Sequence, residues 1–345
     1  MDDELLARAT LSVVPGLSRP QARRVLEGLG VDLPRNLARE IARARADCAG
    51  ERSLAAARAA GIRALAPGDP EFPPALREIP DPPLLIWVRG ALPAAPSLAI
   101  VGSRRPSARG RATAHAFASE LARAGAAILS GLAYGVDAAA HEGALAGGGP
   151  TVAVLASGLL HVTPSGQRGL AERILAAGGA WLSERPPDAD AHPYHFPERN
   201  RLISGLARAT LVVEAREKSG SLWTARHALE QGREVLVVPG PIDSEQCRGT
   251  NRLLRDGATP ILDAGDLRAA VLGPLAAPAQ RPLLPEASPA ARAVLELLAD
   301  GPCDVDALAR SLGRGPRELA TALLELELDG RVRREGTRLS YVPQR

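Results

Sequence analysis

Short apolar runs alternate with longer amphipathic stretches through the middle of the chain. Residues 98–101 (LAIV) form an apolar run that meets a glycine and then cationic residues, which is typical of a buried strand ending in a loop. Residues 107–124 suit a helix that the next glycine ends. A second apolar run, 126–129, then reaches the glycine-bearing loop 130–135. This order predicts a βαβ unit with both loops at the carboxyl edge of a parallel sheet.

The same alternation continues to residue 262. Further strands are predicted at residues 151–155, 180–182, 210–213 and 235–238, with a short one at 260–262. Helices are predicted between them over residues 166–177, 198–207 and 221–231. Strands that alternate with helices in this way predict an α/β fold with a doubly wound parallel sheet.

The predicted sheet has flanking segments on its N-terminal side. Residues 1–65 are predicted to form a helical module with a Pro-Gly turn, and residues 41–60 to form one continuous helix. The module resembles a sterile-alpha-motif (SAM) or helix-hairpin-helix (HhH) module, which can hold nucleic acid through backbone amides, but an ordinary helical hairpin fits the same pattern. The main domain is assigned to residues 66–271, which open with a proline-rich stretch containing a predicted strand at 84–88.

A separate pattern follows the main domain. Residues 272–288 are rich in Pro, Ala and Leu without a period and are predicted to be a linker. Residues 289–345 predict three helices and a hairpin, which resembles a winged helix. The third helix carries Glu318, Glu325 and Glu327, a charge that disfavours insertion into a DNA groove. A DNA-binding and a protein-binding role both remain open for this domain.

Composition bounds the class of protein and its compartment. The chain has 345 residues, 46% of them apolar, enough for two or three domains with a core. Its net charge of +3 and pI near 9.0 are mildly basic and name no partner. No run approaches the ~18 apolar residues of a membrane span, and the acidic first residues do not resemble a signal peptide. The three cysteines form no CxxC pair, so we expect a reducing, cytoplasmic location.

Arginine supplies nearly all the positive charge. Of 42 basic residues Lys218 is the only lysine, which leaves 41 arginines. Codon bias explains this usage, but its physical consequence is that almost every cation is a planar fork suited to phosphate.

Known nucleotide-binding and metal-binding motifs are missing where the predicted fold would place them. The first loop reads Gly102-Ser-Arg-Arg rather than GxGxxG, and the second strand ends in Ser130 rather than an acid. There is no GxxxxGK[ST] loop. The pair His192 and His195 has no carboxylate cluster beside it. We therefore predict no cofactor, no metal and no enzymatic activity.

The first loop instead combines glycine with cations. Gly102 allows backbone amides to approach an anion, and the helix that begins after the loop adds partial positive charge. Arg104 and Arg105 follow the end of a strand, where open α/β sheets place their ligands. This loop is predicted to bind phosphate.

Two later stretches are predicted to reach the same edge. In one, Phe196 offers a ring for base stacking beside the polar and cationic side chains of Arg199, Asn200 and Arg201. In the other, hydroxyls and amides open a helix at Ser219, Gly220 and Ser221. Phosphate binding, base stacking and no catalytic constellation together suggest single-stranded nucleic acid.

Six motifs, in this order, resemble those of the bacterial DNA-processing protein A (DprA/Smf) family across residues 70–262. They are VGSRR, SGLAYGVDAAAHEGAL, HFPERNRLISGL, VVEAREKSGSLWTARHALEQGR, VVPGP and GTNRLLRDGA. The resemblance implies an extended Rossmann-like domain that binds single-stranded DNA without hydrolysing nucleotide. It also implies a homodimer that protects incoming DNA during natural transformation and loads the RecA recombinase onto it. By motif position, the implied DNA-contacting residues are Gly102, Ser103, Arg104, Phe196, Arg199, Asn200, Arg201, Lys218, Ser219 and Gly220.

Some positions depart from the family pattern, and two other functions stay open. Leu160 and Thr163 stand in a loop where the family commonly has an Asp and a Tyr, and Arg185 replaces a usual aromatic residue. A related Rossmann-like enzyme, such as a nucleoside-monophosphate phosphoribohydrolase, is the main alternative, although its PGGxGTxxE-type motif is missing and Glu214 and Glu217 are poor substitutes. A regulator that binds duplex DNA through its C-terminal domain is the third possibility.

Overall fold

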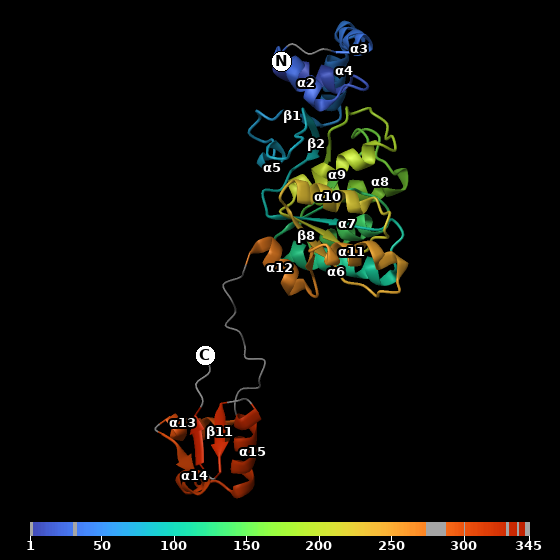
Figure 1. Cartoon of the computed structure of the whole chain (residues 1–345). Helices are drawn as coiled ribbons and strands as arrows, with labels where there is room; N and C mark the ends of the chain where they lie inside the picture. The colour runs from blue at the N-terminus through green and yellow to red at the C-terminus, as the bar shows by residue number, and fades with distance from the viewer. Residues whose placement is uncertain are drawn as a thin grey trace. The chain divides into compact units, whose positions relative to one another are not determined.

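The structure is a computed structural model that describes residues 3–29, 33–273, 288–299, 301–328, 331–336 and 338–341. The chain forms two compact units, Met1–Pro274 and Leu275–Arg345 (Figure 1). Most of the predicted linker, residues 274–287, lies outside the described residues.

A single large sheet organises the first unit. Its nine described strands are β1 (Arg63–Leu65), β2 (Ile86–Gly90), β3 (Ser97–Val101), β4 (Ala127–Ser130), β5 (Thr151–Val154), β6 (Ala180–Ser183), β7 (Ala209–Val212), β8 (Glu234–Val237) and β9 (Thr259–Pro260). Their order is β1-β2-β6-β5-β4-β3-β7-β8-β9. Neighbouring strands are parallel throughout the part of this order that runs β6-β5-β4-β3-β7-β8-β9, which confirms the predicted doubly wound sheet. β1 and β2 extend it with antiparallel pairing, which the sequence did not predict.

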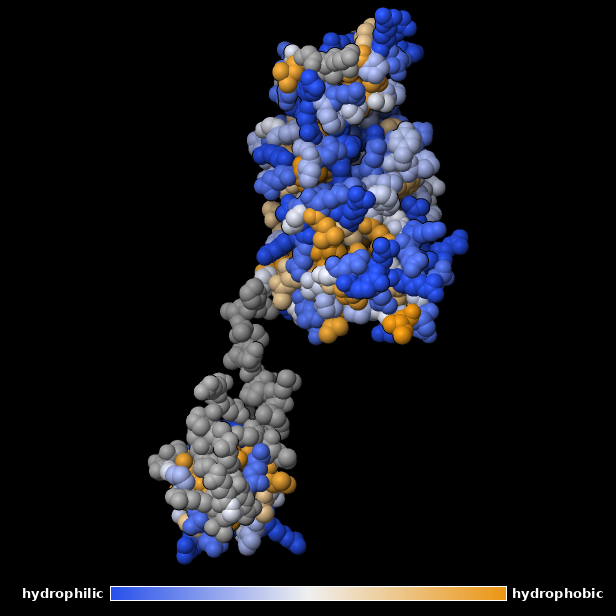
Figure 2. Space-filling model, viewed as in Figure 1, coloured by the Kyte–Doolittle hydropathy of each residue, from blue (hydrophilic) through white to orange (hydrophobic). Residues whose placement is uncertain are grey.

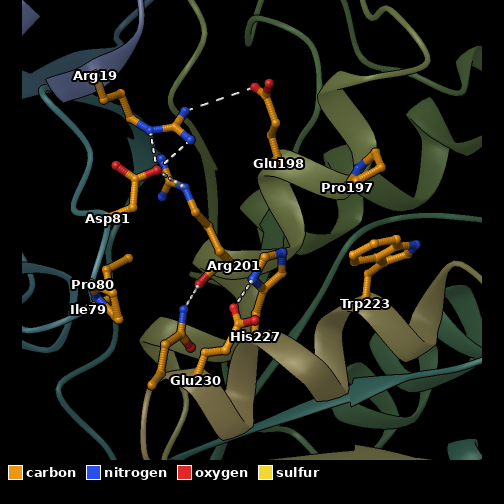
Figure 3. Close-up of a pocket in the computed structure, with 11 residues that line it drawn as sticks. Arg19, Ile79, Pro80, Asp81, Pro197, Glu198, Arg201, Trp223, His227 and Glu230 are labelled. Carbon is orange, nitrogen blue, oxygen red and sulfur yellow. Dashed lines mark hydrogen bonds and ion pairs between the residues drawn. The ribbon is translucent and has the colours of Figure 1, made fainter. Parts of the chain in front are cut away.

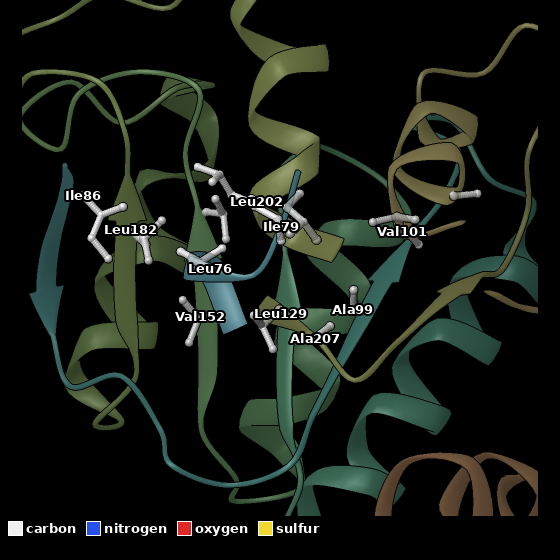
Figure 4. Packing of buried hydrophobic residues seen from close by; sticks show 14 of the residues in the cluster. Leu76, Ile79, Ile86, Ala99, Val101, Leu129, Val152, Leu182, Leu202 and Ala207 are labelled. Carbon is white, nitrogen blue, oxygen red and sulfur yellow. The ribbon is translucent and has the colours of Figure 1, made fainter. Parts of the chain in front are cut away.

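Helices cover both faces of this sheet, so every residue of β4, β5, β6 and β7 is buried. One face packs against α5 (Pro74–Arg77), α9 (His195–Leu206) and α10 (Ser221–Glu230), where Leu76, Leu129 and Leu202 meet (Figure 4). The other face packs against α6 (Ala108–Arg123), α7 (Val136–Ala146) and α12 (Ala264–Leu272). Two further helices, α8 (Arg168–Ala176) and α11 (Arg248–Arg255), complete the αβ alternation.

Helix α6 shows why the sequence predicted its ends correctly. The Ser107 side chain accepts a hydrogen bond from the Gly110 N–H at 2.9 Å, so Ser107 caps the first turn. After the last turn Gly125 adopts a φ of 92°, a conformation that glycine reaches without steric cost.

The N-terminal residues are helical as predicted, but with one more break. The helices are α1 (Asp3–Ser12), α2 (Arg19–Leu26), α3 (Arg35–Ala46) and α4 (Ala49–Ala59). The single helix predicted over 41–60 is wrong, because Cys48 takes a left-handed φ of 49° between α3 and α4. β1 follows directly and pairs with β2, so these helices join the sheet within one compact unit.

The second unit has the predicted winged-helix composition. It contains α13 (Pro289–Ala299), β10 (Cys303–Asp304), α14 (Val305–Leu312), α15 (Pro316–Leu328), β11 (Val332–Glu335) and β12 (Arg338–Tyr341). Its strands pair in the order β10-β12-β11, and β11 and β12 form the predicted hairpin. Leu298, Leu308, Leu326 and Leu339 lie in its own core.

The surface of the first unit is mostly hydrophilic in the view of Figure 2, with apolar residues in small patches between charged ones. None of the described helices has both the length and the apolar character that crossing a bilayer requires.

The left-handed residue between α3 and α4 generates a stability prediction. Cys48 is exposed, so its side chain contributes little packing, while its φ is one that glycine adopts more easily. Cys48→Gly should be more stable than Cys48→Ala by about 1 kcal/mol. Urea unfolding of the two variants measures this difference. Equal stability of the two variants would show that the bend is not strained.

Candidate nucleic-acid interface

The candidate site lies where the chain order of the strands reverses. β3 and β7 are neighbours in the sheet although β4, β5 and β6 come between them in the sequence. The loops after both strands meet there, and the Ser103 N–H donates to the Glu214 carbonyl oxygen at 2.7 Å. Ligands of open α/β sheets bind at such a reversal, outside the carboxyl ends of the strands.

Close packing explains the glycine at the start of the first loop. A Cβ at Gly102 would lie 2.7 Å from Cγ2 of Val136 and 2.9 Å from the carbonyl oxygen of Glu214. Any side chain there would push the β3 loop away from α7 and from the β7 loop. The missing side chain therefore holds the two loops together.

The N-terminus of α6 is occupied by the protein's own carboxylate. Glu214 accepts hydrogen bonds from the Ser107 N–H at 2.8 Å and from the Ser107 hydroxyl at 2.6 Å. Gly110 makes room for this carboxylate, because a Cβ there would lie 2.3 Å from its carbon atom. Since a carboxylate already interacts with the positive end of the helix, phosphate binding at this N-terminus stays a prediction that the Glu214 contact disfavours.

The guanidinium of Arg104 lies on an aromatic ring. The guanidinium carbon of Arg104 is 5.1 Å from the ring centroid of Phe196, and that of Arg199 is 5.9 Å from it. Arg104 and Arg105 are exposed, and Phe196 is half-buried. Three predicted site residues, from the β3 loop and from α9, thus come together as two cations on one ring.

Arg199 differs from Arg104 because it is buried beneath the loops. Its Nη1 donates to the carbonyl oxygens of Gly131, at 2.9 Å, and of Val154. Burial lowers the pKa of Arg199 to about 10, an effect that the nearby Asp137 carboxylate opposes and the charge of Arg104 increases. Burial likewise raises the pKa of Asp137 against the charge of Arg199. These shifts show that burial disfavours the charge on both groups.

Arg201 is also committed to internal partners. Its Nη2 donates to both carboxylate oxygens of Glu184, at 2.7 and 2.6 Å, and its Nε lies 3.4 Å from Asp81. Arg19 of α2 joins the same cluster through Asp81 at 2.5 Å (Figure 3). It also pairs with Glu184 at 3.3 Å. Direct phosphate contacts by Arg199 and Arg201 stay predictions that this burial disfavours. The geometry instead gives Arg201 the role of tying α9 to the N-terminal helices.

The third predicted stretch packs against α9 and leaves its cation at the surface. The Asn200 Nδ2 donates to the Gly220 carbonyl oxygen at 3.3 Å, and the hydroxyls of Ser219 and Ser221 lie 2.8 Å apart. Lys218 is exposed. We call the residues that this region presents at the carboxyl edge the switch-point surface: Arg104, Arg105, Phe196, Asn200, Lys218 and Ser219.

Sequence reasoning missed the acids that organise this region. Asp137 accepts from the Gly131 N–H at 3.1 Å, and Glu184 and Glu214 hold Arg201 and Ser107 as described above. Glu214 meets Ser107 from 107 residues away and Glu184 meets Arg201 from 17 residues away, so no local pattern marks these two acids, whereas Asp137 lies only 6 residues from Gly131. Arg185, which departs from the family pattern, pairs with Glu198. In the part of the chain that the structure describes, no group of three His, Cys, Asp or Glu residues could hold a metal ion.

The fold and the site together define a Rossmann-like α/β protein with an attached winged-helix domain and a cationic, ring-bearing switch point. Comparison with known families narrows this class. The family described as DNA recombination-mediator protein A matches residues 63–271, and the DprA winged helix domain matches residues 277–336. The chain belongs to the DNA-processing protein A (DprA/Smf) family.

Individual relatives agree with this assignment. The chain is 42% identical to Protein Smf of Escherichia coli over 276 residues, which cover 77% of this chain and 74% of that protein. It is 39% identical to DNA processing protein DprA of Bacillus subtilis over 219 residues, which cover 63% and 73% of the two chains.

Two solved structures share the fold. DNA processing protein A of Streptococcus pneumoniae has a TM-score of 0.68 at 31% identity and covers 79% of this chain and 98% of its own. DNA processing protein A of Helicobacter pylori has a TM-score of 0.54 at 30% identity and covers 60% and 93%. The second structure gives insights into the single-stranded DNA binding mode of the H. pylori protein.

The Arg201 contacts predict a large loss of stability when the guanidinium is removed. Glu184 would stay in place with part of its charge uncompensated, and breaking a buried pair in this way costs about 3–5 kcal/mol. Arg201→Met should therefore lower the free energy of unfolding by about 3 kcal/mol. Arg226→Met, which breaks an exposed pair with Glu230, is the control and should change it by less than about 1 kcal/mol. Similar small effects in urea unfolding would contradict this role of Arg201.

The Asp81 carboxylate predicts a dependence of stability on pH. Burial alone would raise the pKa of Asp81, but the hydrogen bond from Arg19 and the charge of Arg201 outweigh it and hold the pKa below its ordinary value. A lowered folded-state pKa contributes stability above the unfolded value of about 3.9, and this is lost as pH falls through the folded-state pKa.

Asp81→Asn should therefore be less stable than the natural protein at pH about 7, and the difference should shrink as pH falls below about 4. Urea unfolding across this range measures it, with Asp256→Asn at an exposed position as the control. A difference that is independent of pH would overturn the assignment.

Proposed function

We propose that this chain is a non-enzymatic protein that binds single-stranded DNA on the switch-point surface. The observation that carries the proposal is the exposed Arg104 guanidinium lying on the Phe196 ring at the reversal of strand order. A guanidinium binds phosphate oxygens as a fork, and an aromatic ring stacks with any base. Together they recognise the backbone and the bases of an open strand without reading its sequence.

The family supports this choice of ligand. Single-stranded DNA is what the H. pylori protein binds. This chain has a similar fold and carries Arg104, Phe196 and Lys218 at its own switch point. Lys218 and the Ser219 hydroxyl extend the phosphate-binding groups from the β3 loop to the β7 loop.

The chemistry of Glu214 supports a binding role over the phosphoribohydrolase alternative. Glu214 is 7% exposed and its carboxylate already accepts two hydrogen bonds from Ser107, so it is poorly placed to act on a substrate. We expect no free base when the chain is incubated with nucleoside monophosphates and the mixture is separated by chromatography. Release of free base would favour the enzyme.

We further propose that the chain acts in the cytoplasm as a homodimer, protects incoming DNA during natural transformation and passes it to the RecA recombinase. The family's description as a recombination mediator supports this role. Because the switch-point surface would contact one side of the DNA strand, the other side of the strand stays accessible to a second protein. RecA assembly on DNA coated with single-strand-binding protein, with and without this chain, measures the transfer.

The switch-point surface predicts the effect of removing Arg104. Arg104→Ala should weaken binding to a single-stranded oligonucleotide about tenfold, because a charge-assisted contact is lost. It should also reduce the slope of log affinity against log salt by about 0.7. Fluorescence anisotropy at several salt concentrations measures both values, and duplex DNA of the same length tests strand preference.

Arg123→Ala is the matched control, since Arg123 is an exposed arginine at the other end of α6. It should leave both values unchanged. Equal affinity and salt slope for Arg104→Ala and Arg123→Ala would remove Arg104 from the site.

A further inference from the structure

A cavity of about 330 Å³ lies between α9 and α10, next to the switch-point surface (Figure 3). The lining residues that bear on its ligand are Arg19, Pro197, Glu198, Arg201, Trp223 and Glu230. Small-ligand cavities span about 300–1,000 Å³, so this one is at the lower end of the range. A single ring system fits it better than a run of nucleotides.

Trp223 gives this cavity a stacking surface. The residue is 48% exposed, whereas the two other tryptophans, Trp87 and Trp181, are 0% and 1% exposed. The Arg226 guanidinium carbon lies 5.5 Å from the Trp223 ring centroid, yet Arg226 does not line the cavity. Another planar group can stack on the part of the indole ring that lines the cavity.

The cavity adjoins the proposed path of the strand. Pro197 and Glu198 line it and directly follow Phe196 on α9. Trp223 belongs to the first turn of α10, which begins directly after the loop containing Ser219. At about 1.5 Å of rise per helical residue, these positions lie within one turn of the switch-point surface.

The charges around the cavity favour a base over a phosphate. Its arginines Arg19 and Arg201 are paired with acids, and its acids Glu198 and Glu230 are paired with Arg185 and Arg226. Among the residues that line the cavity a phosphate would therefore meet no unpaired arginine, whereas a neutral base can stack and donate its N–H groups to the carboxylates.

We propose that this cavity takes one nucleobase of the bound strand, stacked on Trp223, while the phosphates of that strand remain on the switch-point surface. The inference rests on the proposed function, because it needs the strand to lie on that surface first. It assigns to α10 a base-holding role that the phosphate-binding loops do not supply.

Tryptophan fluorescence tests this directly, since Trp223 alone is open to acrylamide. Oligo(dT) should protect Trp223 from acrylamide quenching, and an abasic deoxyribose-phosphate strand of the same length should not. Trp223→Ala should weaken oligo(dT) binding about 5- to 150-fold, the range for losing one base stack, and leave the salt slope unchanged. Trp223→Phe should restore part of the affinity.

Leu229→Ala is the matched control, because Leu229 is 62% exposed on the same helix and does not line the cavity. Protection by the abasic strand equal to that by oligo(dT), or unchanged affinity of Trp223→Ala, would overturn the base-holding role. If Trp223→Ala fails to fold, the quenching comparison on the natural protein still decides. Failure of the natural protein to bind any single strand would instead overturn the proposed function itself.

Discussion

The carboxyl edge of the sheet depends on one buried guanidinium. Arg199 reaches from α9 to the carbonyl oxygens of Gly131 and Val154, at the ends of β4 and β5. If α9 shifted, these contacts would break, and a buried charge without partners costs several kcal/mol. The contacts therefore hold α9 in place. Phe196, on the first turn of the same helix, is thereby held at the point where Arg104 lies on its ring. The position of the exposed cation thus follows from the position of the buried one.

Some arginines of this chain are paired with carboxylates inside the fold, and others are exposed. Glu184 and Asp81 take up Arg201 and Arg19, which joins α9 to the N-terminal helices. Glu214 occupies the end of α6, which disfavours anion binding there. Arg104, Arg105 and Lys218 are outside these arrangements and remain exposed at the carboxyl edge. Exposed arginines also lie elsewhere, Arg45 and Arg123 among them, so composition alone does not mark the surface that we propose to bind phosphate.

Much of the fold is predictable because local patterns determine it. Apolar runs predict the parallel strands, and Ser107 and Gly125 predict both ends of α6 through capping and a positive φ. The break at Cys48 is not predictable, since glycine usually marks that conformation. The sequence predicted which residue types belong to the site, but not which of them are buried, because burial depends on partners that are distant along the chain. Arg199 meets Gly131 from 68 residues away, and Ser107 meets Glu214 from 107 residues away. The sequence does not distinguish arginines that bind phosphate from arginines that bind backbone carbonyls, because the fold determines which partners each arginine meets.

Photo-crosslinking tests the central claim most directly, namely that a single strand lies across the Arg104 and Phe196 pair. The full chain is bound to an oligonucleotide that carries 5-iodouracil, irradiated and digested, and the cross-linked peptides are identified by mass spectrometry. A strand on the switch-point surface should cross-link to the peptide that contains Phe196, and Phe196→Ala should remove that product. Cross-links confined to residues 289–341, with the Phe196 peptide unmodified, would contradict the account.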